Sequence, residues 1–294
     1  MPISIIIPAH NEEAVIERCL GALVRGAEPG ELDVIVVCNG CTDRTAELAR
    51  AFGNPARVIE TEVGSKTHAL NLGDQAARGF PRLYVDADVQ MSCESVRRIA
   101  DVMEHGSWLA AAPRPTTEFA NETSWGVRAY YRFWMALPYV QEGLVAAGIY
   151  ALSKSGRERF GEFPDIINDD LFVRLHFQRS ERIEVRGAVS TVSAPVRFWD
   201  LVRIKTRGRL GAYQLWQRFP ELSWREATGK QYGRALVMVM RHPELWPSAV
   251  PYLLVNLISI WRAARQFRKM DNYKWERDNS SRTSDTCRRA AAGG

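Results

Sequence analysis

The sequence predicts an α/β fold, from its composition and from the alternation of its apolar segments. Of the 294 residues, 46% are hydrophobic and 25% are charged, as in ordinary globular proteins, which excludes a fibrous or wholly disordered chain. Short β-branched runs alternate with longer helix-like segments through residue 112. Strands joined by helical crossovers at this spacing pair in parallel. We therefore expect a Rossmann-like, mostly parallel sheet flanked by helices, followed by a helical C-terminal extension.

The elements of the first half are defined by where each apolar run stops. Residues 4–7 form a β-branched run that ends at Pro8, which is typical of a buried strand. Further strands are predicted at residues 33–37, 57–60 and 83–85, with another apolar run at 108–112. The intervening helices are predicted at residues 43–49, 66–78 and 92–104.

The second half is less regular. It contains an aromatic-rich helical segment at 124–137, an apolar run with Gly148, a short helix at 169–177 and a mixed basic and aromatic segment at 198–219. We expect residues 1–115 and 116–215 to be two halves of one domain, residues 216–277 to form the helical extension and residues 278–294 to be a disordered tail.

The charge and the cysteines narrow the class of protein. The formal charge is +5, and residues 262–294, with nine basic and four acidic side chains, account for all of it. A basic end on a neutral body favours contact with an anionic surface over nucleic-acid binding. The five cysteines are scattered and odd in number, and no signal peptide is visible. These features favour a reducing, cytoplasmic compartment.

Polar residues follow the predicted strands at the points where ligands bind in α/β sheets. Asp86 and Asp88 come directly after residues 83–85, and carboxylates at such a strand end can hold a divalent cation together with substrate phosphates. A solvated strand-end turn explains the same pair. Polar turns at residues 8–12, 38–43 and 64–66 should face the same crevice, although turn and cap chemistry also uses these residue types.

Four segments together carry a resemblance to a known family. Residues 5–12 (Ile-Ile-Ile-Pro-Ala-His-Asn-Glu), 39–45 (Asn-Gly-Cys-Thr-Asp-Arg-Thr), Lys66 with 69–73 (Ala-Leu-Asn-Leu-Gly) and 85–88 (Val-Asp-Ala-Asp) resemble family 2 glycosyltransferases of the GT-A fold. The match in order and spacing runs through residue 110, and more loosely to 215. The resemblance implies inverting transfer of a sugar from a nucleotide-diphosphate sugar to an acceptor hydroxyl, with Mn²⁺ or Mg²⁺ as cofactor. It also implies that residues 1–115 bind the donor and residues 116–215 carry the acceptor site and the catalytic base.

The resemblance implies roles for individual residues. The residues that match donor-binding positions are Pro8, His10, Glu12, Asn39, Lys66 and Asp86. Asn39 stands where the family usually has an Asp, and Cys38 replaces a further Asp, so the nucleotide base stays open. Asp86 and Asp88 match the metal motif, with Asp88 preferred as the direct ligand.

The catalytic base is expected at the start of the helix at 169–177. Inverting transfer needs a group that takes the proton of the acceptor hydroxyl. The segment Asn168-Asp169-Asp170 resembles the family's Glu-Asp motif, with Asp169 in place of the Glu. We favour Asp170 as the base over Asp169. Helix capping and the helix dipole explain these residues too, and capping is compatible with catalysis.

Residues 203–211 and the cysteine pair leave alternatives open. The chain lacks the processive Gln-x-x-Arg-Trp motif, and Arg207 and Arg209 in that region either clamp the donor diphosphate or form a solvated basic face. Cys38 and Cys41 form a C-x-x-C pair, so a thiol redox protein is one alternative function. A non-catalytic nucleotide-sugar-binding module is another.

The segment at 243–269 bears on location. Residues 245–261 are uncharged, include Pro247 and Pro251, and precede Arg262, Arg265, Arg268 and Lys269. This pattern predicts either an interfacial helix on an anionic cytoplasmic leaflet or a buried core hairpin. In the first case the protein is peripheral on the inner face of the cell membrane. The acceptor is then expected to be a saccharide or lipid-linked molecule, in the synthesis of cell-envelope polysaccharide or glycolipid.

Overall fold

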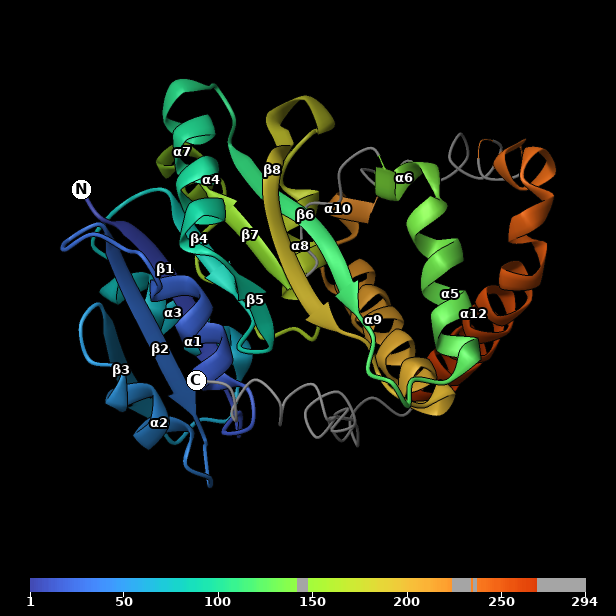
Figure 1. The fold of residues 1–294 in the computed structure, drawn as a ribbon, viewed down its shortest axis with the longest axis horizontal. Helices are drawn as coiled ribbons and strands as arrows, with labels where there is room; N and C mark the ends of the chain where they lie inside the picture. Colours follow the sequence, from blue (N-terminus) through green and yellow to red (C-terminus); the bar gives the residue numbers. More distant parts are fainter. Residues whose placement is uncertain (142–147, 224–233, 235–236, 269–294) are drawn as a thin grey trace.

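The computed structural model describes residues 1–141, 148–223, 234 and 237–268. Within these residues, one sheet of eight strands has the order β3-β2-β1-β4-β7-β6-β8-β5 (Figure 1). The strands are β1 (Ile3–Ala9), β2 (Leu32–Asn39), β3 (Ala56–Thr61), β4 (Arg82–Val85), β5 (Val89–Met91), β6 (Ala110–Glu118), β7 (Ile149–Leu152) and β8 (Arg182–Ser193). The predicted tail at 278–294 lies outside the described residues.

Helices cover both faces of this sheet. They are α1 (Ile16–Val24), α2 (Thr45–Ala51), α3 (Lys66–Ala76), α4 (Cys93–His105), α5 (Trp125–Ala136), α6 (Pro138–Gln141), α7 (Lys154–Arg157), α8 (Asp169–Leu175), α9 (Phe198–Arg218), α10 (Pro220–Ser223) and α12 (Trp246–Phe267). The described residues also form two short 3₁₀ helices, η1 (Arg179–Glu181) and η2 (Pro243–Leu245). Helices α1, α2 and α4 pack on one face, and α3, α8 and α9 on the other. The fold is α/β, as expected.

The first half of the sheet is parallel, as the sequence predicts. Strand β1 pairs in parallel with both β2 and β4, and β2 pairs in parallel with β3. Ile5, Ile6 and Ile7 are fully buried because successive side chains point to opposite faces and helices cover both. The carboxyl ends of β1, β2 and β4 therefore meet at one edge.

The second half of the sheet is mixed. Strand β7 is antiparallel to both β4 and β6, and β5 is antiparallel to β8, whereas β6 and β8 are parallel. Strand β8 was not predicted. Only Val185, Ala188 and Ser190 of its twelve residues are buried, so its sequence lacks both a continuous apolar run and a regular alternation.

The C-terminal extension is helical. Helices α5, α9 and α12 pack together at the end of the molecule away from β3 (Figure 1). Among the described helices, none is both long and apolar enough to cross a bilayer.

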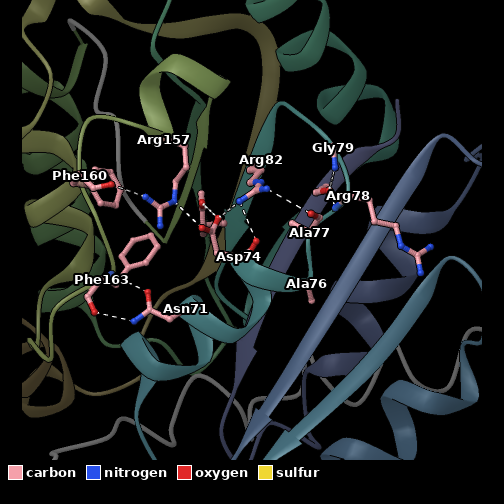
Figure 2. A network of polar contacts seen from close by, with 12 residues as sticks. Asn71, Asp74, Ala76, Ala77, Arg78, Gly79, Arg82, Arg157, Phe160 and Phe163 are labelled. Carbon is pink, nitrogen blue, oxygen red and sulfur yellow. Dashed lines mark hydrogen bonds and ion pairs between the residues drawn. The ribbon is translucent and has the colours of Figure 1, made fainter.

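Polar contacts fix α3 between the sheet and the loop that leads to α8. The Asn71 amide donates to the Phe163 carbonyl at 2.9 Å and accepts from the Phe163 N–H at 2.8 Å (Figure 2). Asp74 binds Arg82 at 2.7 Å and Arg157 at 2.8 Å. At Gly73 a Cβ atom would overlap the side chain of Ile6, so a larger residue would push α3 away from β1. The Ala-Leu-Asn-Leu-Gly segment (69–73) thus fixes the position of α3 against β1 and against the loop at Phe163.

Candidate active site

A cleft of about 1260 Å³ lies along the carboxyl edge of β1, β2 and β4 and continues toward α5, α9 and α12. Every candidate site residue that the sequence singled out lines it. These residues are Pro8, His10, Glu12, Asn39, Lys66, Asp86, Asp88, Asp169, Asp170, Arg207 and Arg209. The structure therefore brings together side chains from six separate segments of the chain.

The turn after β1 is held to the turn after β2 by side-chain contacts. The buried Asn39 amide donates to the Ala9 carbonyl at 2.9 Å, and the Asn39 carbonyl contacts His10 Nδ1. Asn11 adopts a left-handed conformation (φ 52°), and its side-chain oxygen accepts from the Thr42 N–H at 2.7 Å. Asparagine tolerates this conformation better than most residues. These contacts give the floor of the cleft a fixed shape.

Lys66 links the turn after β4 to the start of α8. It is the first residue of α3, and its ammonium lies 2.7 Å from Asp86 Oδ1 and 3.0 Å from Asp169 Oδ1. Burial disfavours the charged ammonium, but the carboxylates of Asp169 and Asp86 outweigh it and raise the pKa of Lys66 well above its ordinary value. Lys66 is therefore a fixed positive charge.

Gly148 joins Asp86 to Asp170 through its backbone. Its N–H donates to Asp170 Oδ2 at 3.0 Å, and its carbonyl accepts from the Asp86 N–H at 2.8 Å. Gly148 has φ +78°, and a Cβ there would lie 3.1 Å from the side chain of Val89 and 3.3 Å from Asp86 Oδ2. Both the conformation and the close approach favour glycine.

The proton affinity of Asp170 is tuned by its surroundings. Burial and the neighbouring Asp169 carboxylate raise the pKa of Asp170 to about 7, against the opposing effects of Lys66 and of the Gly148 N–H. A carboxyl group with a pKa near the working pH suits general-base catalysis.

The start of α8 is held by both a cap and α9. Asn168 caps the helix by accepting from the Leu171 N–H at 3.0 Å, and its amide donates to the Gly208 carbonyl at 3.2 Å. At Gly211 a Cβ would lie 2.7 Å from the Asn168 Cβ, so α9 approaches as closely as a glycine allows. The turn that caps α8 therefore also fixes the positions of Asp169 and Asp170.

Both arginines of the predicted basic segment line the cleft. Arg209 lines the cleft, but its guanidinium donates to Ser259 Oγ at 2.9 Å and to Asn256 Oδ1, both on α12. Arg207 precedes Arg209 by two residues on α9 and also lines the cleft. Arg209 thus ties α9 to α12 at the wall of the cleft.

Tyr130, Trp134, Lys205 and Tyr252 also line the cleft. The resemblance placed the aromatic segment with Tyr130 and Trp134 near the acceptor, but sequence reasoning did not single out Lys205 or Tyr252. The aromatic segment was noted, but its rings could equally have been core. Lys205 lies one helical turn before Arg209, and this i, i+4 spacing is the signal that would have placed it on the same face.

The acidic residues fit a divalent cation only in company with a substrate. Across the described parts of the chain, no group of three or more His, Cys, Asp or Glu residues could hold a metal ion. Asp86 and Asp88 both line the cleft, and Asp86 also binds Lys66. Two carboxylates completed by diphosphate oxygens and waters form a donor set that Mg²⁺ and similar cations accept.

Comparison with known proteins identifies the family. The model of glycosyl transferase family 2 matches residues 4–152, which is half of the chain. The chain belongs to this family.

Curated relatives match about a third of this family 2 glycosyltransferase. It is 33% identical over 105 residues to the uncharacterized glycosyltransferase EpsJ of Bacillus subtilis, and 38% identical over 91 residues to the 4,4'-diaponeurosporenoate glycosyltransferase of Staphylococcus aureus. These matches cover 35% and 30% of this chain, but only 30% and 24% of the two relatives.

Solved structures confirm the GT-A fold. The mannosyltransferase PcManGT of Pyrobaculum calidifontis, in complex with GDP-Man and Mn²⁺, superposes with a TM-score of 0.63 at 19% identity, over 92% of this chain and 88% of that one. Glucosyl-3-phosphoglycerate synthase of Mycobacterium tuberculosis, in complex with Mn²⁺, UDP and phosphoglyceric acid, gives 0.50 at 22% identity, over 74% and 78%.

The cysteine pair of this glycosyltransferase is part of the turn architecture. Cys38 and Cys41 are free thiols. Cys41 Sγ accepts from the Asn11 N–H at 3.4 Å and donates to the Ala9 carbonyl at 3.4 Å. Through these contacts Cys41 joins the turn after β2 to the turn after β1, which is a structural role.

Proposed function

We propose that this family 2 glycosyltransferase moves a sugar from a nucleotide-diphosphate sugar to an acceptor hydroxyl by one direct displacement, with inversion at the anomeric carbon. The observation that carries the proposal is the Gly148 backbone, which hydrogen-bonds to Asp86 on one side and to Asp170 on the other. A single glycine therefore sets the position of the base relative to the donor end of the cleft.

In the proposed reaction, the Asp170 carboxylate takes the proton of the acceptor hydroxyl. The acceptor oxygen forms its bond to the anomeric carbon while the bond from that carbon to the diphosphate breaks, and the electron pair leaves with the diphosphate. Asp169 is engaged by Lys66, which leaves Asp170 as the carboxylate for the acceptor. Lys66 holds a positive charge at the donor end, where negative charge develops.

We assign Mn²⁺ or Mg²⁺ to Asp88 and Asp86. Such a cation, when bound, neutralises negative charge on the departing diphosphate. The complexes of the two structural neighbours contain Mn²⁺ with GDP-Man or UDP, and they support this cofactor class and a nucleotide-sugar donor. Pro8, His10, Glu12 and Asn39 then line the nucleotide end of the cleft.

A thermal-shift screen tests the donor assignment. The purified protein is heated with UDP, GDP, CDP or dTDP, each with and without Mn²⁺. A nucleotide at 100 times its Kd stabilises the native state by about 2.7 kcal/mol, which raises the Tm of a chain of this size by roughly 5 °C. We expect one nucleotide to give this shift only with Mn²⁺, and Asp88→Asn to remove it. The absence of a shift with all four contradicts the proposal.

We also propose that α12 rests on an anionic membrane surface. Its large exposed apolar residues recur at helical spacing and form one stripe, the α12 stripe: Trp246, Val250, Leu253, Leu254, Leu257, Ile260 and Trp261. Exposed Arg265 and Arg268 follow at the C-terminal end. Aromatic and aliphatic residues beside basic ones are typical of interfacial helices. A lipid-linked or saccharide acceptor, in the synthesis of envelope polysaccharide or glycolipid, is consistent with such a site.

A further inference from the structure

The cleft has two chemically different ends. The end at β1, β2 and β4 presents carboxylates and Lys66, which the proposed reaction assigns to the donor. The other end lies between α5, α9 and α12 and presents the rings of Tyr130, Trp134 and Tyr252 together with Lys205. The proposed reaction leaves this second end to the acceptor.

Lys205 occupies an environment unlike that of Lys66. Its ammonium lies 5.3 Å from the ring centre of Tyr130, 5.9 Å from that of Tyr131 and 5.2 Å from that of Trp134. Within the described part of the chain, it makes no hydrogen bond and no ion pair, whereas Lys66 contacts two carboxylates. The faces of aromatic rings stabilise a cation without neutralising it.

A second cation strengthens the positive potential around Lys205. Burial and the charge of Arg209 lower the pKa of Lys205 to about 8. Arg209 is fixed by Ser259 and Asn256, so it contributes charge while two of its donors are already used. A partly buried ammonium that lacks a counter-ion is unfavourable, and a bound anion removes that penalty.

We propose that Lys205 is the centre of an acceptor subsite that binds an anionic group of the phosphate-monoester class, an inference that rests on the proposed transfer reaction. The ammonium supplies the hydrogen bonds to the anion, and the rings of Tyr130, Trp134 and Tyr252 contact the apolar or sugar part beside it. The acceptor therefore carries an anion in addition to the hydroxyl that reacts. The anion belongs either to a free phosphorylated compound or to a phospholipid-type carrier.

Calorimetric titration with two phosphate monoesters tests the subsite. Glycerol 3-phosphate represents a free phosphate, and farnesyl monophosphate represents one on an apolar chain. The full-length protein is first saturated with its nucleotide and Mn²⁺, so that the donor end cannot take the probe. We expect Lys205→Met to weaken probe binding roughly 10- to 100-fold, as expected for loss of a hydrogen bond to a charged group. Lys205→Arg should retain most of the affinity.

The matched control is Arg197→Met, which removes one exposed positive charge at the N-terminal end of α9, outside the cleft lining. It should bind both probes as the wild type does. Tighter binding of farnesyl monophosphate identifies a lipid-type carrier, and equal binding of the two probes identifies a free phosphorylated acceptor. Equal probe affinity of wild type and Lys205→Met, with nucleotide bound, overturns the subsite alone. A wild type that binds no nucleotide overturns the proposed function and the subsite with it.

Discussion

Asp170 is the residue on which the rate of transfer is expected to depend most. Only its ionised form accepts a proton, and its pKa is about 7. We predict that kcat/KM rises with pH through about 7 and then levels off. Above pH 7, Asp170→Asn should lower kcat roughly 10²- to 10⁴-fold and should abolish this rise. Steady-state assays across the pH range measure both effects.

The control for Asp170→Asn is nucleotide binding, which should persist in the thermal-shift assay. Unchanged turnover would remove Asp170 as the base and would assign proton removal to another group. The raised pKa also affects stability. The native state holds this proton more tightly than the unfolded chain, so the contribution of Asp170 to the free energy of unfolding falls as the pH rises from 3.8 to about 7.

Gly148 provides a second test at the scale of one residue. We predict that Gly148→Ala lowers the Tm and reduces kcat more than it raises the KM for the donor, because a left-handed conformation costs alanine about 1–2 kcal/mol and the new Cβ displaces Asp86 from Asp170. Gly161→Ala is the matched control, since a Cβ there meets nothing within 4 Å. If Gly148→Ala had the kcat and Tm of the wild type, Gly148 would not determine the positions of Asp86 and Asp170.

At the scale of elements, the α12 stripe should bind membranes. We predict that the protein sediments with vesicles that contain phosphatidylglycerol, and that Leu253→Ser combined with Leu257→Ser weakens this binding at least tenfold. Both leucines are about half exposed or more, so burying them in lipid contributes about 1.5–3 kcal/mol each at most.

Two controls accompany the vesicle experiment. Val189→Ser removes an exposed apolar residue of β8 and should leave sedimentation unchanged. Neutral phosphatidylcholine vesicles should bind less protein, because Arg265 and Arg268 then lack anionic partners. Equal sedimentation of the wild type and the double variant would contradict a membrane role for α12.

The sequence predicted some elements well and others poorly, for physical reasons. Strands β1 and β2 are continuous β-branched runs, which buried parallel strands require. Strand β8 carries no such pattern. For α12, the sequence allowed an interfacial or a core helix, because hydropathy alone does not say which face is covered. The structure has one face packed on α5 and α9 and the other exposed.

At the scale of the whole molecule, the cleft could be predicted in outline from the sequence. Parallel strands place their carboxyl ends at one edge, so the residues after β1, β2 and β4 were expected together, and they line one cleft. Of the opposing wall, only Arg207 and Arg209 on α9 were singled out. Its shape could not be predicted, because it arises from α5, α9 and α12, which are far apart in sequence. The rings around Lys205 depend on that packing. The Gly148 link between Asp86 and Asp170 depends on the pairing of β4 with β7 and on the placement of α8.

Helix α12 belongs to two surfaces at once. Tyr252 and Asn256 face the cleft, Asn256 holds Arg209, and the α12 stripe faces outward. Any free-energy coupling between two such sites is reciprocal. If docking on a lipid surface improves the fit of an acceptor in the cleft by some factor, a bound acceptor must retain the protein on that surface by the same factor. Release from the surface would then follow departure of the glycosylated product, without a separate signal.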